Sequence, residues 1–157
     1  TIRSEAKDVD FSHSSISSFV TDIHYVGGQS YIFPLYIYHD ESKVKLLDEK
    51  ASKPECVPNI SKEFLYALKE ALCTEPTPEE IFYYIYAVLY SPTYRKRYEE
   101  FLKIDFPRVP LPPNLEKFKN LSELGKELVE LHLLKHPSLS ETEIGFPVSG
   151  SNTVEKV

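Results

Sequence analysis

Two runs near the start of the chain alternate or cluster apolar residues in the manner of β-strands. Residues 16–26 and 31–38 are rich in β-branched and aromatic residues, and a Gly-Gly pair between them is a turn signal, so we expect two paired strands. Pro34 has no N–H to donate to a ladder, which places the second strand at a sheet edge or a bulge. The charged, proline-containing stretch over residues 39–60 predicts a long surface loop.

The middle of the chain has apolar residues at helical spacing, which predicts two helices. The first covers residues 61–73. The second begins with Thr77 as its N-cap and Pro78 at the first helical position, and Glu80 completes a capping box. Residues 81–90 are apolar or aromatic on all sides, so we expect this helix to be enclosed at the centre of the core.

The C-terminal half predicts two further helices with an extended segment between them. Ser91-Pro92 repeats the helix-start signal, so a helix is expected over residues 92–102. Residues 106–112 contain three prolines and predict an extended segment laid against the core. A third long helix, capped by Asn114 or Asn120, follows. Its predicted apolar face consists of Leu121, Leu124, Leu128, Leu131 and Leu134.

These elements define an α+β class: a helical core of about four helices packed with a small, mostly antiparallel sheet. We expect one domain over residues 1–157. Residues 1–15 are predicted to be an irregular lead-in, and residues 137–157 a loop with the start of further strands, at 144–148 and 154–157. No internal repeat or heptad array is visible, which excludes a solenoid or a long coiled coil.

Composition adds that the chain is expected to be a fragment of a larger protein, truncated at both ends. It contains no methionine, including at position 1. Cys56 and Cys73 lie far apart without metal-binding spacing, which favours reduced thiols in a bacterial cytoplasm. The longest strongly apolar run has ten residues, 81–90, and a membrane span needs roughly 20. We therefore expect no contact with a membrane.

One stretch is far more specific than any short motif. Residues 77–112 read TPEEIFYYIYAVLYSPTYRKRYEEFLKIDFPRVPLP, preceded by YIFPLYIY at 31–38 and followed by LSELGKELVELHLL at 121–134. Together they resemble the C-terminal target-recognition (specificity) region of type ISP and type IIG single-chain restriction-modification enzymes, whose core is an adenine-specific DNA methyltransferase. The resemblance spans roughly residues 16–157 and implies a target-recognition-domain-like fold.

The resemblance implies a function for the fragment and a chemistry for its parent. The fragment is expected to recognise a sequence in double-stranded DNA and to position the duplex for methylation by a methyltransferase domain upstream in the same chain. The parent would use S-adenosylmethionine, with Mg and ATP for other domains. The fragment itself is expected to be non-catalytic and without cofactor or metal. Its one double proline, Pro112-Pro113, lacks the flanking residues of the methyltransferase motif.

Net charge restricts where DNA could be held. Eighteen Lys and Arg against 24 Asp and Glu leave −6, so contacts with phosphates must be local. A dense basic cluster lies among tyrosines at residues 90–98. The predicted phosphate-binding residues are Arg95, Lys96, Arg97, Lys103 and Arg108. The alternative is a solvated helix face in which Arg95 pairs with Glu99 and Lys96 with Glu100, while the tyrosines pack in the core.

Base reading is expected in loops, because the family resemblance implies a constant scaffold that reads the major groove through variable loops. Lys recognises guanine, Gln adenine, and Asp or Glu cytosine. The candidates are Gln29 and Ser30 in the predicted turn, and Lys43, Lys45, Asp48, Glu49 and Lys50 in the long loop.

Three other interpretations remain open at this point. A scaffold that joins the methyltransferase to motor or nuclease domains would leave the leucines of the third long helix exposed. A small metal-dependent nuclease could be built on Glu41 and Lys43 with Asp22. His132 and His136, four residues apart, could share a helix face and hold a metal, although no third ligand lies beside them.

Overall fold

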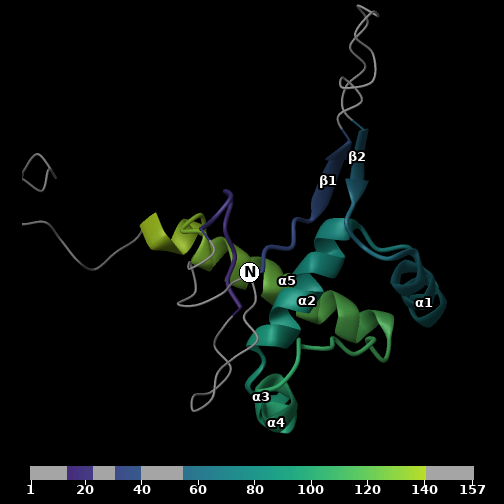
Figure 1. The fold of residues 1–157 in the computed structure, drawn as a ribbon. Helices are drawn as coiled ribbons and strands as arrows, with labels where there is room; N and C mark the ends of the chain where they lie inside the picture. The colour runs from purple at the N-terminus through teal and green to yellow at the C-terminus, as the bar shows by residue number, and fades with distance from the viewer. Residues whose placement is uncertain (1–13, 23–30, 40–54, 141–157) are drawn as a thin grey trace, which may run out of the picture.

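Five α-helices and a two-stranded antiparallel sheet make up the parts of the chain that the computed structural model describes, which are residues 14–22, 31–39 and 55–140 (Figure 1). This content confirms the predicted α+β class. No helix in these ranges is both long enough and apolar enough to cross a membrane. In chain order the elements are β1 (Tyr36–His39), β2 (Glu55–Pro58), α1 (Lys62–Leu72), α2 (Pro78–Tyr90), α3 (Pro92–Arg97), α4 (Glu99–Leu102), α5 (Leu115–His132) and the 3-10 helix η2 (Pro137–Ser140).

The sheet pairs different segments from those predicted. β1 pairs with β2, with Ile37 opposite Val57, so the partner strand lies inside the stretch predicted as a loop. Residues 16–22 of the first predicted strand form no strand, and residues 23–26 lie outside the described ranges. The Ser17 hydroxyl bonds to the backbone of Phe19, a local turn that competes with a ladder. Val57 precedes a proline, which favours its extended conformation.

Helix α2 lies at the centre of the molecule, as predicted. Its start is fixed by the expected capping box: the Thr77 hydroxyl accepts from the Glu80 N–H, and the Glu80 carboxylate accepts from the Thr77 N–H at 2.8 Å. Side chains on several sides of α2 are buried. Figure 1 shows α5 running across α2, and this is the most extensive contact between elements in the described residues.

Helix α5 meets α2 mainly through residues outside the predicted leucine stripe, of which Leu121 packs against the core. Its buried residues are Phe118, Ser122, Gly125 and Val129. A Cβ atom at Gly125 would lie 1.9 Å from the carbonyl oxygen of Tyr83, and the Ser122 hydroxyl donates to the Glu80 carbonyl at 2.9 Å. Leu124 is 59% exposed, because the close crossing turns the leucines to the flanks or outward. The backbones can approach only where side chains are this small.

The ends of α5 also refine the prediction. Asn114, and not Asn120, is the N-cap, and its side chain accepts from the Lys117 N–H at 2.8 Å. The helix ends at His132, and Leu134 has a positive φ of 58°, the left-handed conformation that commonly closes a helix. Part of the predicted C-terminal loop is the helix η2, whereas residues 144–148 and 154–157 lie outside the described ranges.

The proline-rich segment after α4 is extended and is held against the core, as predicted. The Tyr94 hydroxyl donates to the Arg108 carbonyl at 2.9 Å, and the Tyr84 hydroxyl donates to the Pro110 carbonyl at 2.8 Å. Both tyrosines are buried. The single helix expected over residues 92–102 is instead two short helices, α3 and α4, which meet at Tyr98.

Substituting Gly125 tests the close crossing. Gly125→Ala should lower the free energy of unfolding by about 1–3 kcal/mol or more, because the added methyl group overlaps the Tyr83 carbonyl. At an open helix position the same change would stabilise by roughly 0.5–1 kcal/mol. Urea unfolding of Gly125→Ala beside Glu123→Ala, an exposed control on the same helix, measures the effect. A stabilised Gly125→Ala variant would contradict the crossing.

The buried Tyr84 hydroxyl makes an alkaline prediction. Burial raises the pKa of Tyr84 to about 12, above its ordinary value of 10.0, so its neutral form stabilises the fold fully below pH 10. That contribution is lost as pH rises from about 10 to 12. Tyr84→Phe should lower the free energy of unfolding by about 1 kcal/mol at neutral pH, because the hydrogen bond to the Pro110 carbonyl is lost. Above pH 10 the free energy of unfolding of this variant should fall less steeply with pH than that of the unsubstituted chain.

Urea unfolding between pH 7 and pH 12 compares the variant with the unsubstituted 157-residue chain. Tyr66→Phe, which changes an exposed tyrosine on α1, is the matched control, and its free energy of unfolding should match that of the unsubstituted chain at every pH. Equal slopes for Tyr84→Phe and the unsubstituted chain above pH 10 would contradict the role of the buried hydroxyl.

Candidate nucleic-acid interface

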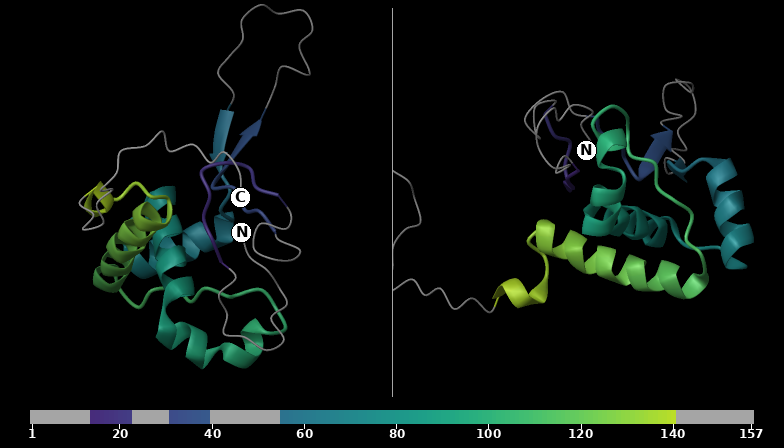
Figure 2. Two further views of the ribbon diagram at one scale, coloured as in Figure 1. Left: turned by 90° about the vertical axis from the view of Figure 1, so that its left-hand side faces the viewer. Right: turned by 90° about the horizontal axis from the view of Figure 1, so that it is seen from below.

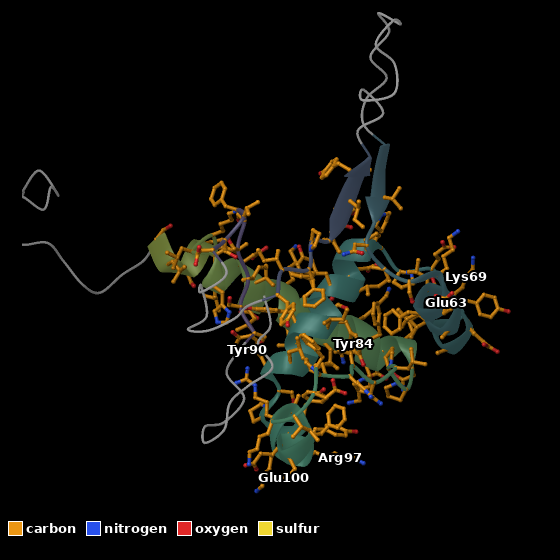
Figure 3. The ribbon with its side chains drawn as sticks, in the orientation of Figure 1. Glu63, Lys69, Tyr84, Tyr90, Arg97 and Glu100 are labelled. Atoms are coloured by element: carbon orange, nitrogen blue, oxygen red, sulfur yellow. The ribbon has the colours of Figure 1, made fainter. Side chains whose placement is uncertain are left out.

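The predicted phosphate-binding residues lie on α3, α4 and the segment that follows them. Ser91 caps α3 through a bond from the Tyr94 N–H, and Pro92 occupies the first turn. Residues 95–108 contain five basic and three acidic residues, which gives a local charge of +2 in a chain of −6. Figure 3 shows Arg97 and Glu100 at the end of the molecule formed by α3 and α4. The two short helices thus present a locally basic surface.

Arg95 is directed toward the protein. Its Nε donates to the carbonyl of Leu89 at 2.7 Å, and its guanidinium lies 4.6 Å from the ring centroid of Tyr90. The Leu89 carbonyl belongs to the last turn of α2, where carbonyls lack helical partners and favour cations. Arg95 therefore joins α3 to the end of α2, which is a structural role.

Lys96 and Arg97 are exposed and have no acidic partner among the described residues. Glu99 and Glu100, which were the expected partners of Arg95 and Lys96, both bind Lys103 instead. The guanidinium of Arg97 lies 5.7 Å from the ring centroid of Tyr98, the residue between α3 and α4. Such a contact orients an arginine without neutralising it. These two side chains are available to phosphates.

Lys103 and Arg108 carry charge that is partly compensated. The Lys103 ammonium group donates to Glu100 at 2.8 Å and to Glu99 at 3.1 Å, and these bonds raise its pKa. Arg108 lies 3.3 Å from Asp105 and stacks on Phe101 at 5.1 Å. Its side chain is 79% exposed, so the pair with Asp105 is weak. Among the five candidates, Lys96 and Arg97 are exposed without an acidic partner in the described residues, and Arg108 is exposed with a weak one.

The predicted base-reading residues lie outside the described ranges, but the elements next to them are described. Lys43, Lys45, Asp48, Glu49 and Lys50 occur in residues 40–54, which join β1 to β2, while Gln29 and Ser30 precede the lead-in to β1. Figure 1 and the left view of Figure 2 show the two strands as a ribbon that rises from the helices. Chain connectivity thus associates both groups with this ribbon.

The ribbon is anchored at its foot by contacts that the sequence did not reveal. The Tyr36 hydroxyl donates to the Glu79 carboxylate at the start of α2, which raises the pKa of Tyr36 to about 12. Asn59 donates through its backbone to the Leu35 carbonyl at 2.8 Å and through its amide to the Pro34 carbonyl at 2.9 Å. Sequence spacing gives no signal for these bonds, which join residues 24 to 43 positions apart.

The alternative metal sites find no support in the described residues. His132 bonds through Nδ1 to the Tyr86 hydroxyl at 2.7 Å, and His136 bonds to the Ser138 hydroxyl at 2.6 Å. Because α5 ends at His132, the two histidines do not share a helix face. No group of three or more His, Cys, Asp or Glu suited to a metal occurs in the described ranges. Glu41 and Lys43 of the nuclease hypothesis lie outside those ranges.

The leucines of α5 give a mixed answer to the scaffold interpretation. Leu124 is exposed, as that interpretation requires, whereas Leu128 and Leu131 are half-buried. Leu134, which follows α5, is also exposed. Leucines exposed singly are ordinary for a protein surface, so these two do not favour a protein-binding helix over a DNA-binding surface.

Comparison with known proteins gives one family and one solved structure. A family model described as the Type ISP C-terminal specificity domain matches residues 1–157, which is the whole chain. A chain in the structure titled "cryoEM structure DrdV-DNA complex" is similar, with 36% identity and a TM-score of 0.46. That similarity covers 51% of this chain and 8% of the other. The comparison with curated proteins yields no match.

The different roles of neighbouring cations can be separated by stability. Arg95→Ala should lower the free energy of unfolding by about 1.5–3 kcal/mol, because it removes a charge-assisted hydrogen bond to Leu89. Lys96→Ala should change it by no more than about 0.5 kcal/mol, because Lys96 is exposed and touches no acidic partner in the described residues. Thermal and urea unfolding of both variants measures the difference. Equal effects would contradict the inward role of Arg95.

Proposed function

The chain belongs to the Type ISP C-terminal specificity domain family, and from that membership we propose that it recognises a DNA sequence for a restriction-modification enzyme. The observation that carries the proposal is the match of the family model to the whole chain. The exposed cations of α3 supply the charge that phosphate contacts need, since phosphate contacts provide affinity and position while base contacts provide sequence information.

We assign the two kinds of contact to different parts of the molecule. Lys96 and Arg97 bind backbone phosphates and set the register of the domain on the duplex. The β1–β2 ribbon carries the base-reading residues, because the major groove admits a two-stranded β-ribbon. Lys43, Lys45, Asp48 and Lys50 in the connection between the strands, with Gln29 and Ser30 before β1, then contact base edges.

In the parent enzyme the domain positions DNA for a methyltransferase domain upstream in the same chain. That enzyme flips an adenine out of the duplex and methylates it with S-adenosylmethionine, as type ISP and type IIG resemblance implies. Extrusion of a base needs a duplex that is held in a fixed register. The domain contributes binding and orientation and takes no part in the chemistry.

A salt titration tests the phosphate contacts. Fluorescence anisotropy measures the affinity of the chain for a pool of random duplex DNA from low to high salt. If Lys96 and Arg97 each neutralise one phosphate, the double variant Lys96→Gln, Arg97→Gln should bind more weakly, with a log-log salt slope reduced by about 2. The charge-matched control is Lys117→Gln, Lys119→Gln on α5, whose slope should match that of the unsubstituted chain.

Sequencing the bound duplexes tests recognition itself. The unsubstituted chain is expected to enrich one short motif. The α3 double variant should bind more weakly while enriching the same motif, because phosphate contacts carry no sequence information. An unchanged salt slope in that variant would exclude α3 as the phosphate surface. Binding without enrichment would contradict sequence recognition by this chain.

A further inference from the structure

A cavity of about 340 Å³ opens on one side of α2, at the foot of the β1–β2 ribbon. Its walls come from α2, from residues 14–15, from residues 33–35 before β1 and from residues 59–60 after β2. The volume is within the range of sites that hold a ligand or an anchoring side chain. We call this cavity the α2 socket.

The lining of the α2 socket is apolar and uncharged. Ile81, Phe82 and Ile85 of α2 face Phe33 and Leu35 across it, and its polar side chains are mainly serines and Asn59. The Asn59 amide already donates to the Pro34 carbonyl. Without a cation the socket cannot hold a phosphate. A nucleobase would lose hydrogen bonds to water at several ring-edge atoms, and each polar group left unpaired in an apolar site is costly.

The mouth of the socket continues into exposed apolar surface. Phe33 is 56% exposed, and its neighbours Tyr31 and Ile32 are also exposed. The rings of Tyr31 and Phe33 both pack edge-on against Phe106, with centroids 5.1 and 6.2 Å apart, so the patch is an ordered part of the surface. A contiguous apolar patch around a pocket is typical of a protein contact in which one buried side chain anchors the partner.

We propose that the α2 socket docks apolar side chains of the domain that precedes the specificity domain in a type ISP polypeptide. The proposal rests on the proposed function. The family is defined as a C-terminal domain, so a preceding domain of the same polypeptide is a protein surface held at high effective concentration beside it. The uncharged lining matches the apolar centre of a protein interface and not a DNA contact, which is polar and basic.

The place of the socket in the fold gives the docking a purpose. Leu35 precedes β1 directly and Asn59 follows β2, and the hydrogen bond between them anchors the ribbon, so two residues of the socket wall also hold the ribbon foot. A partner seated there would fix the direction of the ribbon relative to the preceding domain. The docking thereby sets the distance between base reading and methylation.

Thiol labelling measures whether the socket is covered. Cys56 and Cys73 are exposed and are first replaced by Ser, after which Leu35→Cys places a thiol in the socket wall. Leu124→Cys on α5 is the exposed control, and Phe33→Cys at the mouth serves as a second probe should Leu35→Cys fail to fold. Circular dichroism checks each variant. Each thiol is labelled with a maleimide in the 157-residue chain and in a type ISP polypeptide that carries this domain after its preceding domains.

The expected result, without DNA, is that labelling of the socket thiol slows about tenfold or more in the longer polypeptide, because a socket covered nine-tenths of the time admits reagent for about one-tenth of it. The Leu124→Cys control should change by less than about twofold, since its surface is not part of the socket. Equal labelling of the socket thiol in both proteins overturns the proposal.

Other outcomes overturn the proposal in favour of a different occupant. Protection that grows with the concentration of the 157-residue chain assigns the socket to a second copy. Protection that is already complete in the dilute chain means that its own residues fill the socket. Protection only after duplex DNA is added assigns it to nucleic acid. Because the main comparison contains no DNA, its failure is distinct from failure of the salt titration that tests DNA recognition.

Discussion

The close crossing of α2 and α5 is the constraint on which the rest of the structure depends. Gly125 allows the backbone of α5 to reach the Tyr83 carbonyl, and Ser122 ties α5 to the first turn of α2. With α5 on one side, α2 presents its other sides to the extended segment, to the ribbon foot and to residues 14–15. The capping box at Thr77 fixes where α2 begins, and Arg95 fixes how α3 leaves its end. The position of the basic surface therefore depends on a helix crossing that Gly125 and Ser122 keep close.

The aromatic signature of the chain is explained by this arrangement. Four tyrosines of residues 84–94 each use the hydroxyl to bond another segment: Tyr84 to Pro110, Tyr86 to His132, Tyr90 to Ser14 and Tyr94 to Arg108. Each ring contributes apolar area at one end and a hydrogen bond at the other. The tyrosines thus hold irregular segments against the helices, as expected of the constant framework that supports variable loops. These four rings pack inside the protein and are not platforms on which bases stack. Tyr98 is more exposed than they are.

Features set by neighbouring residues were predictable from the sequence, whereas features set by distant segments were not. The capping box and the extended proline segment follow from local backbone chemistry, and both are confirmed. The leucine stripe of α5 was wrong in part, because Leu121 packs against the core whereas Leu124 and Leu134 are exposed. Leucines at helical spacing outweigh one glycine in any hydrophobic pattern, while the glycine decides how closely two backbones approach. Strand pairing was wrong because register depends on partners far apart in sequence. The sequence predicted five phosphate-binding residues but did not distinguish Arg95, whose guanidinium lies against the Leu89 carbonyl and the Tyr90 ring.

The charge distribution limits what the domain can do alone. Only Lys96 and Arg97 among the five phosphate candidates are exposed without an acidic partner in the described residues. Two phosphate contacts give a salt dependence of about tenfold in affinity between 50 and 200 mM, against roughly 10³–10⁵ for proteins with 6–10 contacts. Lys96 and Arg97 by themselves would therefore account for only a small part of the salt-dependent affinity that such proteins have for DNA. In the proposed function, a neighbouring domain that holds the duplex supplies the remaining affinity. The uncharged socket at the foot of the β1–β2 ribbon is the kind of contact that would keep the two domains in register.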